Sequence, residues 1–502
     1  MAPKSECPCR SHERLRRGNP YHKELPLVSR YASKEFSWVE GAAFLCGAIG
    51  TQLMSEMIAQ WLAYFYSPTE GGVRTIYVGL QLIGFAVAAG RVWDAFTDPL
   101  IGVWSDITKS IPGRFRIPRI AGRRRPFIFW GAVGMLFTGS AIWYPPVAHE
   151  STINFVFVSA VVCLHWLFFT IANIPLLALG PEVARSQEAR MKLGVWWATG
   201  MIVGLAIAVI VPPMLIDALS SSGEPGDPTG YQRTGVLFAV AALLLFLMPV
   251  LLVRERYVGA EEEAPGAGHT FAMRMRQARR EFRDALSNKP FLLYLGATFA
   301  SSIGVLGMQR VLPNWIEVGL QGDESLMTKI MGPFILTALL TALAMYPLLP
   351  TITRRIPIKW LFLSTFVITL VTLPCMYLIS VADVDVSVKV MMASAIFAIG
   401  GVGQGITYVL STAIMGEIID FDERRFGQRR EAVFNGVFGI AVKMGQAFAL
   451  FSSTQIMFFL GNSHENPTGI FVMGPIAGIY AMIAIGFALA YPVLSVTKRT
   501  ED

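Results

Sequence analysis

Charged residues are scarce in this chain. They make up 15% of its 502 residues, whereas hydrophobic residues make up 53%, and the mean hydropathy is +0.50. A soluble globular domain carries roughly 25% charged residues. The shortage of charge therefore excludes an ordinary soluble domain and indicates an integral membrane protein.

Several other features are missing as well. The five cysteines are scattered, so no disulfide framework is indicated. The first 37 residues lack the apolar run of a cleavable signal peptide, so we expect the first spanning helix to direct insertion. We find no P-loop, dinucleotide fingerprint, H-E-x-x-H motif or nucleophile–base arrangement. We therefore expect no enzyme, no ATP-driven pump and no cofactor.

Long apolar segments dominate what is present, and a helix needs about 20 residues to cross a bilayer. We predict an all-α membrane protein with twelve transmembrane helices in two six-helix bundles. The expected spans are 38–66, 74–105, 127–144, 153–180, 193–218, 232–253, 290–319, 327–350, 358–380, 387–418, 432–460 and 469–497. The corresponding regions are a basic tail (1–37), the N-terminal bundle (38–253), a central loop (254–289), the C-terminal bundle (290–497) and a short tail (498–502).

The basic residues indicate the orientation. The segments that lie on one side of this map, including both tails and the central loop, hold 35 of the 42 Lys and Arg residues. Positive charge collects on the cytoplasmic side of membrane proteins, so we predict that both termini are cytoplasmic. The central loop ends in "MRMRQARREFRDAL", which is typical of a basic amphipathic helix on the inner membrane surface. The net charge of +7 thus needs no nucleic-acid partner.

The segment "RVWDAFTDP" (91–99) places charges inside an apolar span. Arg91, Asp94 and Asp98 are spaced i, i+3 and i+7, so they share one helix face, which must turn away from lipid. A structural pair of Arg91 with Asp94 is one interpretation, but it leaves the second carboxylate unbalanced. Two further interpretations stay open, a hard-cation site of oxygen ligands, with Na⁺ as the metal, and a proton-binding pair.

Few residues within the spans stand out as partners for these charges. The candidates are Gln52, Glu56, Thr170, Asn173, Arg310 and Lys443. For Arg310, we consider pairing with the nearby Glu317 and, as the alternative, an anion clamp that faces the cavity. On the cytoplasmic side, Asp106 precedes "GRRRP" (122–126), and such charges can latch helices together at an inner gate, which makes Arg123 and Arg124 candidates.

These residues resemble a known family. "GRVWDAFTDPLIGVWSD" with "GRRRP", "FFTIANIP", "NKPFLLYL" and "EIIDFDERRFGQRREAVFNGVFGIAVKMGQAF" (417–448) are similar to the glycoside–pentoside–hexuronide:cation symporters, the melibiose permease group of the major facilitator superfamily. The resemblance extends from the first span to the eleventh. It implies two bundles that rock around a central cavity.

The resemblance also implies roles for individual residues. Asp94, Asp98 and Thr170 match cation-coordinating positions, with Asn173 at a position where melibiose permease has an Asp, and Lys443 matches the lysine that takes part in coupling. The loop positions that match charged gate residues are Arg190, Glu423, Arg429 and Glu431.

The substrate half of the family pattern is largely replaced. Gln52 stands where the family has an Asp, Leu177 where it has a sugar-stacking Trp, and Tyr408 where it has another Trp. The substrate-site candidates are therefore Gln52, Glu56, Arg91, Asn173, Arg310, Tyr408 and Lys443.

We expect a cation-coupled (H⁺ or Na⁺) symporter of a sugar or glycoside, with a carboxylated sugar as a variant suggested by Arg310 and Lys443. The alternative is a symporter of a lysophospholipid or another amphipathic solute, and a non-transporting receptor or scaffold is a third. The expected partners are a small-molecule substrate and the lipid bilayer, without ATP. We further expect a monomer in the plasma membrane, or the inner membrane of a bacterium.

Overall fold

Long helices make up almost the whole structure. The computed structural model describes residues 36–72, 74–108, 122–184, 186–221, 227–253, 255, 280, 282–320, 324–427 and 430–492. The tails, most of the central loop with its predicted amphipathic helix, and the loop at 109–121 lie outside the described residues. Among the described helices, ten are long and apolar enough to cross a membrane. Two more long helices are α3, which carries the Arg91–Asp98 charges, and α4, which has 17 residues.

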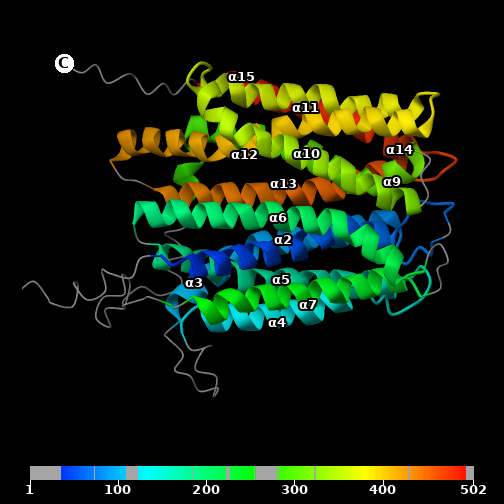
Figure 1. Ribbon diagram of the computed structural model, residues 1–502, viewed down its shortest axis with the longest axis horizontal. Coiled ribbons are helices and arrows are strands. Elements are labelled where there is room, and N and C mark those ends of the chain that lie inside the picture. Colours follow the sequence, from blue (N-terminus) through cyan, green and yellow to red (C-terminus); the bar gives the residue numbers. More distant parts are fainter. Residues whose placement is uncertain are drawn as a thin grey trace, which may run out of the picture.

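The helices fall into two groups along the chain. The first group is α2 (Trp38–Tyr66), α3 (Leu80–Ile107), α4 (Arg125–Ala141), α5 (Thr152–Val183), α6 (Gln187–Leu219) and α7 (Thr229–Leu252). The second group is α9 (Lys289–Gly319), α10 (Glu324–Thr353), α11 (Ile358–Val381), α12 (Val386–Phe426), α13 (Glu431–Leu460), α14 (Thr468–Phe471) and α15 (Met473–Ala490). Figure 1 shows the first group below and the second above, with the helices of both roughly aligned.

Local sequence explains several helix ends. Ser37 caps α2 in a capping box with Glu40, whose carboxylate accepts the Ser37 N–H at 3.1 Å. Asn288 caps α9 just before Pro290, a residue suited to the first helical turn. The helix α12 runs eight residues past the predicted end at 418, because "EIIDFDERRF" contains no breaker before Gly427, which adopts a left-handed φ of 69°.

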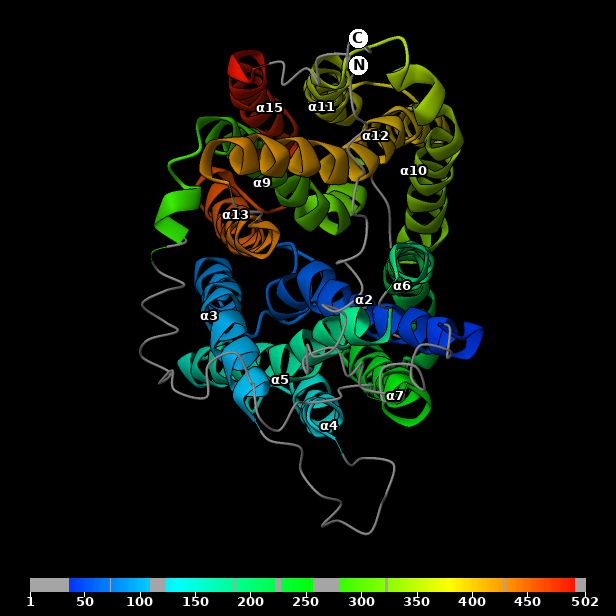
Figure 2. The ribbon, with the colours of Figure 1, turned by 90° about the vertical axis from the view of Figure 1, so that its left-hand side faces the viewer.

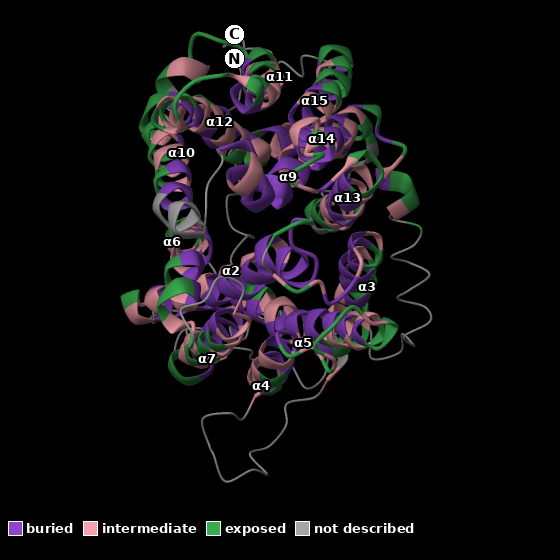
Figure 3. Cartoon of the chain, turned by 90° about the vertical axis from the view of Figure 1, so that its right-hand side faces the viewer, coloured by how far each residue is buried: buried purple, intermediate pink, exposed green. Residues whose placement is uncertain are grey.

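Two helix pairs make the most extensive contacts between the bundles. Viewed from either end, α3 lies beside α13, and α6 lies beside α10 (Figures 2 and 3). Gly84 on α3 allows the first of these approaches, since a Cβ atom there would collide with the Thr454 side chain of α13. Residues that line this seam therefore face the opposite bundle instead of lipid.

The bundles are tied together at the end of the molecule that carries the α2–α3 loop and α14, which we call the α14 end. The Glu70 amide donates to the Asn462 carbonyl at 2.8 Å, across the bundles. The Gln60 amide on α2 donates to the Gln309 carbonyl on α9 at 2.7 Å. The bundles are therefore in direct contact at the α14 end, on the right of Figure 1.

Candidate functional site

Four polar side chains meet where α3 faces α13. The Lys443 Nζ lies 2.5 Å from Asp98 Oδ2 and 2.8 Å from Asp94 Oδ2. The Thr170 hydroxyl of α5 donates to Asp94 Oδ1 at 2.8 Å and lies 3.2 Å from Asp98 Oδ1. Two carboxylates of the N-terminal bundle thus share one ammonium from the C-terminal bundle, so this cluster bridges the seam.

Exposure differs within this cluster. The Asp94 side chain is 0% exposed, whereas Lys443 and Asp98 are 19% and 22% exposed. Asp98 is therefore the more accessible of the two carboxylates.

Arg91 supports the cluster from within α3. Its Nη1 lies 3.9 Å from Asp94 Oδ2, its Nη2 donates to Ser55 of α2 at 3.3 Å, and its guanidinium stacks over Trp166 at 3.7 Å from the ring centroid. The closest cation to Asp94 is therefore Lys443, and the predicted Arg91–Asp94 pair is the longer contact. Two carboxylates and two basic groups give this cluster a formal charge of zero.

The ligand chemistry of this cluster is that of a hard cation. Carboxylate and hydroxyl oxygens suit Na⁺ or a proton better than a soft metal. Across the described part of the chain, no three His, Cys, Asp or Glu side chains converge on one point. The oxygen ligands available here include the two carboxylates and the Thr170 hydroxyl, with the Thr97 hydroxyl 3.3 Å from that of Thr170.

Other predicted residues lie outside this cluster. The Asn173 Oδ1 accepts a hydrogen bond from Thr51 of α2 at 3.1 Å. Gln52 packs against Gly204 of α6, and Glu56 is half-buried on α2. Tyr408 is 57% exposed on α12 and lines a cavity in the C-terminal bundle.

Of the two interpretations of Arg310, the pairing with Glu317 is not what the structure shows. The Glu317 carboxylate accepts hydrogen bonds from Tyr64 at 2.9 Å and Thr69 at 2.8 Å, and it lies 3.5 Å from His464 Nε2. Seven residues separate Arg310 from Glu317, which is about 10 Å along a helix, and the acid turns toward the opposite bundle instead. Arg310 is 2% exposed, and its Nε and Nη1 have no hydrogen-bond partner among the described residues.

The gate candidates of the first bundle form contacts within that bundle. Arg123 and Arg124 contact Glu182 at the end of α5, at 2.8 and 2.9 Å. Arg190 donates to the Ala184 carbonyl at 3.2 Å. The side chain of Asp106 lies outside the described residues.

The gate candidates of the second bundle lie around the α12–α13 turn. Glu423 is in the last turn of α12, and Glu431 is the first residue of α13. Arg429 lies outside the described residues. Sequence reasoning missed the neighbouring bidentate pair of Arg430 with Asp422, at 2.8 to 2.9 Å, although the charge-rich segment around it was a visible signal.

The comparisons with known proteins agree with this architecture. An uncharacterized symporter, sll1374, of Synechocystis sp. is 21% identical over 90% of this chain and 93% of its own length. The glucuronide carrier protein homolog of Escherichia coli is 24% identical over 83% of this chain and 82% of its own. The solved xylose transporter XylE from E. coli, in a partially occluded inward open conformation, shares the fold with a TM-score of 0.56 and 14% identity, over 89% of this chain and 95% of that one.

A family model described as MFS/sugar transport protein matches residues 43–495, which is most of the chain. The resemblance inferred from the span motifs is thereby confirmed. The chain is a multi-pass membrane transporter of the major facilitator type, and it belongs to the MFS/sugar transport protein family, the glycoside–pentoside–hexuronide symporters.

Proposed function

We propose that this protein is a secondary transporter that couples the movement of H⁺ or Na⁺ to that of a sugar or glycoside. The observation that supports this proposal most directly is the contact of Lys443 with both Asp94 and Asp98 across the seam of the bundles. Charged groups within a membrane are costly and are retained for ion pathways or coupling. A non-transporting scaffold would have no reason to keep these charged side chains within the membrane.

The coupling step follows from competition at this cluster. The Lys443 ammonium now occupies the space between the two carboxylates. A proton or Na⁺ that binds these carboxylates weakens their hold on Lys443, and the bond between α3 and α13 is released. Ion binding thus changes the contact between the two bundles, which is what alternating access requires.

Symport also requires that ion and substrate bind better together than apart. In the ion-free state, Lys443 holds the seam together at the level of this cluster. Release of this contact by the ion lets the bundles adjust to the substrate. The same reciprocity requires the substrate to raise the affinity for the ion.

The proposed topology has twelve spans, with both termini in the cytoplasm. The α14 end then faces outward, and the structure is closed on that side. The bilayer is that of the plasma membrane, or the inner membrane of a bacterium, and the protein works as a monomer without ATP or a cofactor. The similarity to the glucuronide carrier protein homolog of E. coli supports a sugar as the substrate class.

Reconstituted proteoliposomes test this proposal. The wild-type protein is expected to accumulate a labelled sugar from a panel of glycosides when a proton or Na⁺ gradient is imposed. Asp94→Asn and Asp98→Asn are expected to fold but to lose uphill accumulation. Asp383→Asn, the same change at an exposed position before α12, serves as the control. Undiminished accumulation by both cluster variants would refute the proposal.

A further inference from the structure

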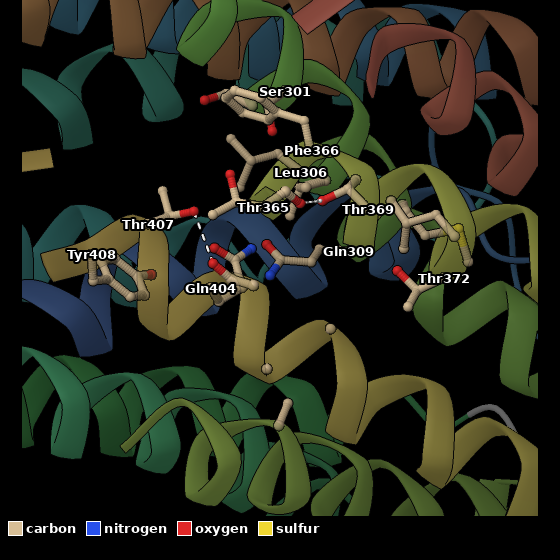
Figure 4. A pocket seen from close by; sticks show the side chains of 18 of the residues that line it. Ser301, Leu306, Gln309, Thr365, Phe366, Thr369, Thr372, Gln404, Thr407 and Tyr408 are labelled. Carbon is tan, nitrogen blue, oxygen red and sulfur yellow. Dashed lines mark hydrogen bonds between the residues drawn. The ribbon is translucent and has the colours of Figure 1, made fainter. Parts of the chain in front are cut away.

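The C-terminal bundle contains a cavity of about 500 Å³. Its walls come from α9, α10, α11, α12 and α13, and Figure 4 shows many of its side chains. Gln309 and Tyr408 line it and are also exposed, so it is not sealed. This volume falls in the range of about 300–1,000 Å³ that is usual for small-molecule sites.

The wall of this cavity carries no formal charge. Among the described residues that line it, none is Asp, Glu, Lys, Arg or His. Arg310 is not part of the wall, and the ammonium of Lys443 is held by two carboxylates. An anionic ligand in this cavity would lose its hydration without gaining a counter-ion, which is strongly unfavourable.

The hydroxyl groups of this wall are arranged as acceptors. Thr298, Thr365, Thr369, Thr372 and Thr407 all donate their proton to a carbonyl of their own helix, at 2.8 to 3.1 Å. A hydroxyl that donates in this way keeps lone pairs that accept further hydrogen bonds. This wall therefore complements a ligand that is rich in O–H donors.

A buried hydroxyl without a partner and three side-chain amides complete the polar lining. The Tyr294 residue is 1% exposed, and its hydroxyl has no hydrogen-bond partner among the described residues. The side-chain amides of Gln309, Gln404 and Gln446 also line the cavity, and each offers donors and an acceptor. Figure 4 shows Gln309 and Gln404 projecting into the cavity. A buried polar group without a partner is costly, and a ligand hydroxyl would satisfy it.

The cavity also presents aromatic surface. The rings of Tyr294 and Phe438 stack at 5.5 Å with an interplanar angle of 15°, and both line the wall with Phe362 and Phe366. Sugar rings have apolar C–H faces and polar hydroxyl rims. Aromatic rings beside amides and hydroxyl acceptors match that division.

We propose that this cavity is the binding site for the organic substrate, and that it takes an uncharged, polyhydroxylated ring such as a neutral glycoside and discriminates against carboxylated sugars. This inference rests on the proposed transport function and specifies its substrate class. It places the recognising side chains in the C-terminal bundle. The family pattern directs attention to Gln52, Asn173 and Leu177 in the N-terminal bundle, and only its Tyr408 position lies in this cavity.

The helix α13 connects this cavity to the cation cluster. Val442 and Gln446 line the cavity, and Lys443 of the same helix contacts Asp94 and Asp98. A movement of α13 that follows release of Lys443 therefore repositions Gln446 at the substrate. The two sites share a rigid element, which gives ion and substrate a physical route for coupling.

Equilibrium binding to the purified full-length protein tests the assignment. The probes are phenyl glucoside and phenyl galactoside, their matched phenyl uronides, which differ by one carboxylate, and lysophosphatidylcholine. Titration calorimetry is run at two pH values, with and without sodium. We expect a neutral glycoside to bind at least tenfold more tightly than its uronide.

Variants then locate the site. Gln404→Leu and Gln446→Leu are each expected to raise the Kd of the neutral glycoside by about tenfold, since each removes hydrogen bonds to a buried ligand. Gln232→Leu on α7 is the same change outside the cavity and is expected to leave the Kd unchanged. Thr369→Val, a nearly isosteric change, tests the wall if a glutamine variant fails to fold.

Three outcomes overturn the assignment. The first is that the uronide binds as tightly as the neutral glycoside or more tightly. The second is that no neutral glycoside binds, whether or not lysophosphatidylcholine does. The third is that the cavity variants bind the glycoside like the wild type. A glycoside that binds through Gln404 and Gln446 but is not accumulated along an ion gradient would refute the transport proposal alone. A glycoside that is accumulated but unaffected by these variants would refute the cavity assignment alone.

Discussion

Removal of the Lys443 ammonium is expected to destabilise the protein by leaving the buried Asp94 carboxylate and the partly exposed Asp98 carboxylate without their nearest cation. The Nζ lies 2.5 Å and 2.8 Å from the carboxylate oxygens of Asp98 and Asp94. At an effective dielectric constant of 20, each contact corresponds to about 6 kcal/mol of Coulomb energy. Desolvation offsets much of this, and breaking a buried ion pair by removing one partner typically costs about 3–5 kcal/mol. We expect Lys443→Met to lose stability in that range.

A charge-balanced double variant separates this effect from lost packing. Lys443→Met with Asp98→Asn restores the formal charge of the cluster to zero, so it should recover more than half of the loss. The control is Lys192→Met, which breaks a pair with Glu188 at 2.7 Å whose side chains are 62% and 72% exposed. Exposed pairs contribute about 0–1 kcal/mol, so this variant should match the wild type.

Thermal unfolding in detergent, followed by tryptophan fluorescence, measures these differences. The single variant is expected to lower the midpoint by about 3–5 °C. A Lys443→Met protein as stable as the wild type, or a double variant no more stable than the single one, would refute the account of this cluster as a buried ionic link.

Three further predictions follow from other contacts. Thr170→Val removes the hydroxyl that donates to Asp94, so it should weaken ion binding about tenfold, whereas Thr170→Ser should not. Equal ion affinity of the two variants in calorimetry would contradict this prediction. Glu317→Ala removes the acceptor of the Tyr64 and Thr69 hydroxyls, so it should favour separation of the bundles at the α14 end. Spin-label distances between the loops at 67–72 and 461–467 measure this separation, and an unchanged distance distribution argues against the prediction. Glu255→Ala leaves the backbone N–H groups of Arg123, Arg124 and Arg125 without their acceptor and should lower the unfolding free energy by about 1–3 kcal/mol, which an unaltered thermal midpoint would disprove.

Much of the architecture could be predicted from the sequence. Apolar segments of sufficient length predicted the long helices, because a bilayer leaves the backbone few alternatives. The spacing of Arg91, Asp94 and Asp98 predicted a shared helix face, and the resemblance supplied Thr170 and Lys443 as neighbours. The structure brings these residues together at the seam, with Arg91 as a longer-range support.

The remaining features depend on packing between distant segments. Glu317 lies on the same helix as Arg310, but its partners Tyr64 and Thr69 come from the other bundle. The three glutamines of the cavity are spread over α9, α12 and α13, and no local pattern brings them together. Gln455 reaches the Gln81 carbonyl across the seam, which only the approach of α3 to α13 makes possible. Sequence periodicity identifies which face of a helix is buried, but it does not identify the other helix that packs against that face.

Ion flux driven by a substrate gradient tests the central claim most directly. Proteoliposomes without an initial ion gradient receive an inward gradient of the neutral glycoside that the protein binds, and entry of protons or of labelled sodium is recorded. The account predicts ion uptake that depends on the glycoside, stops in Asp98→Asn and persists in Asp383→Asn. Glycoside entry without any ion movement in the wild-type protein would contradict the claim that the Asp94–Asp98–Lys443 cluster couples the two fluxes.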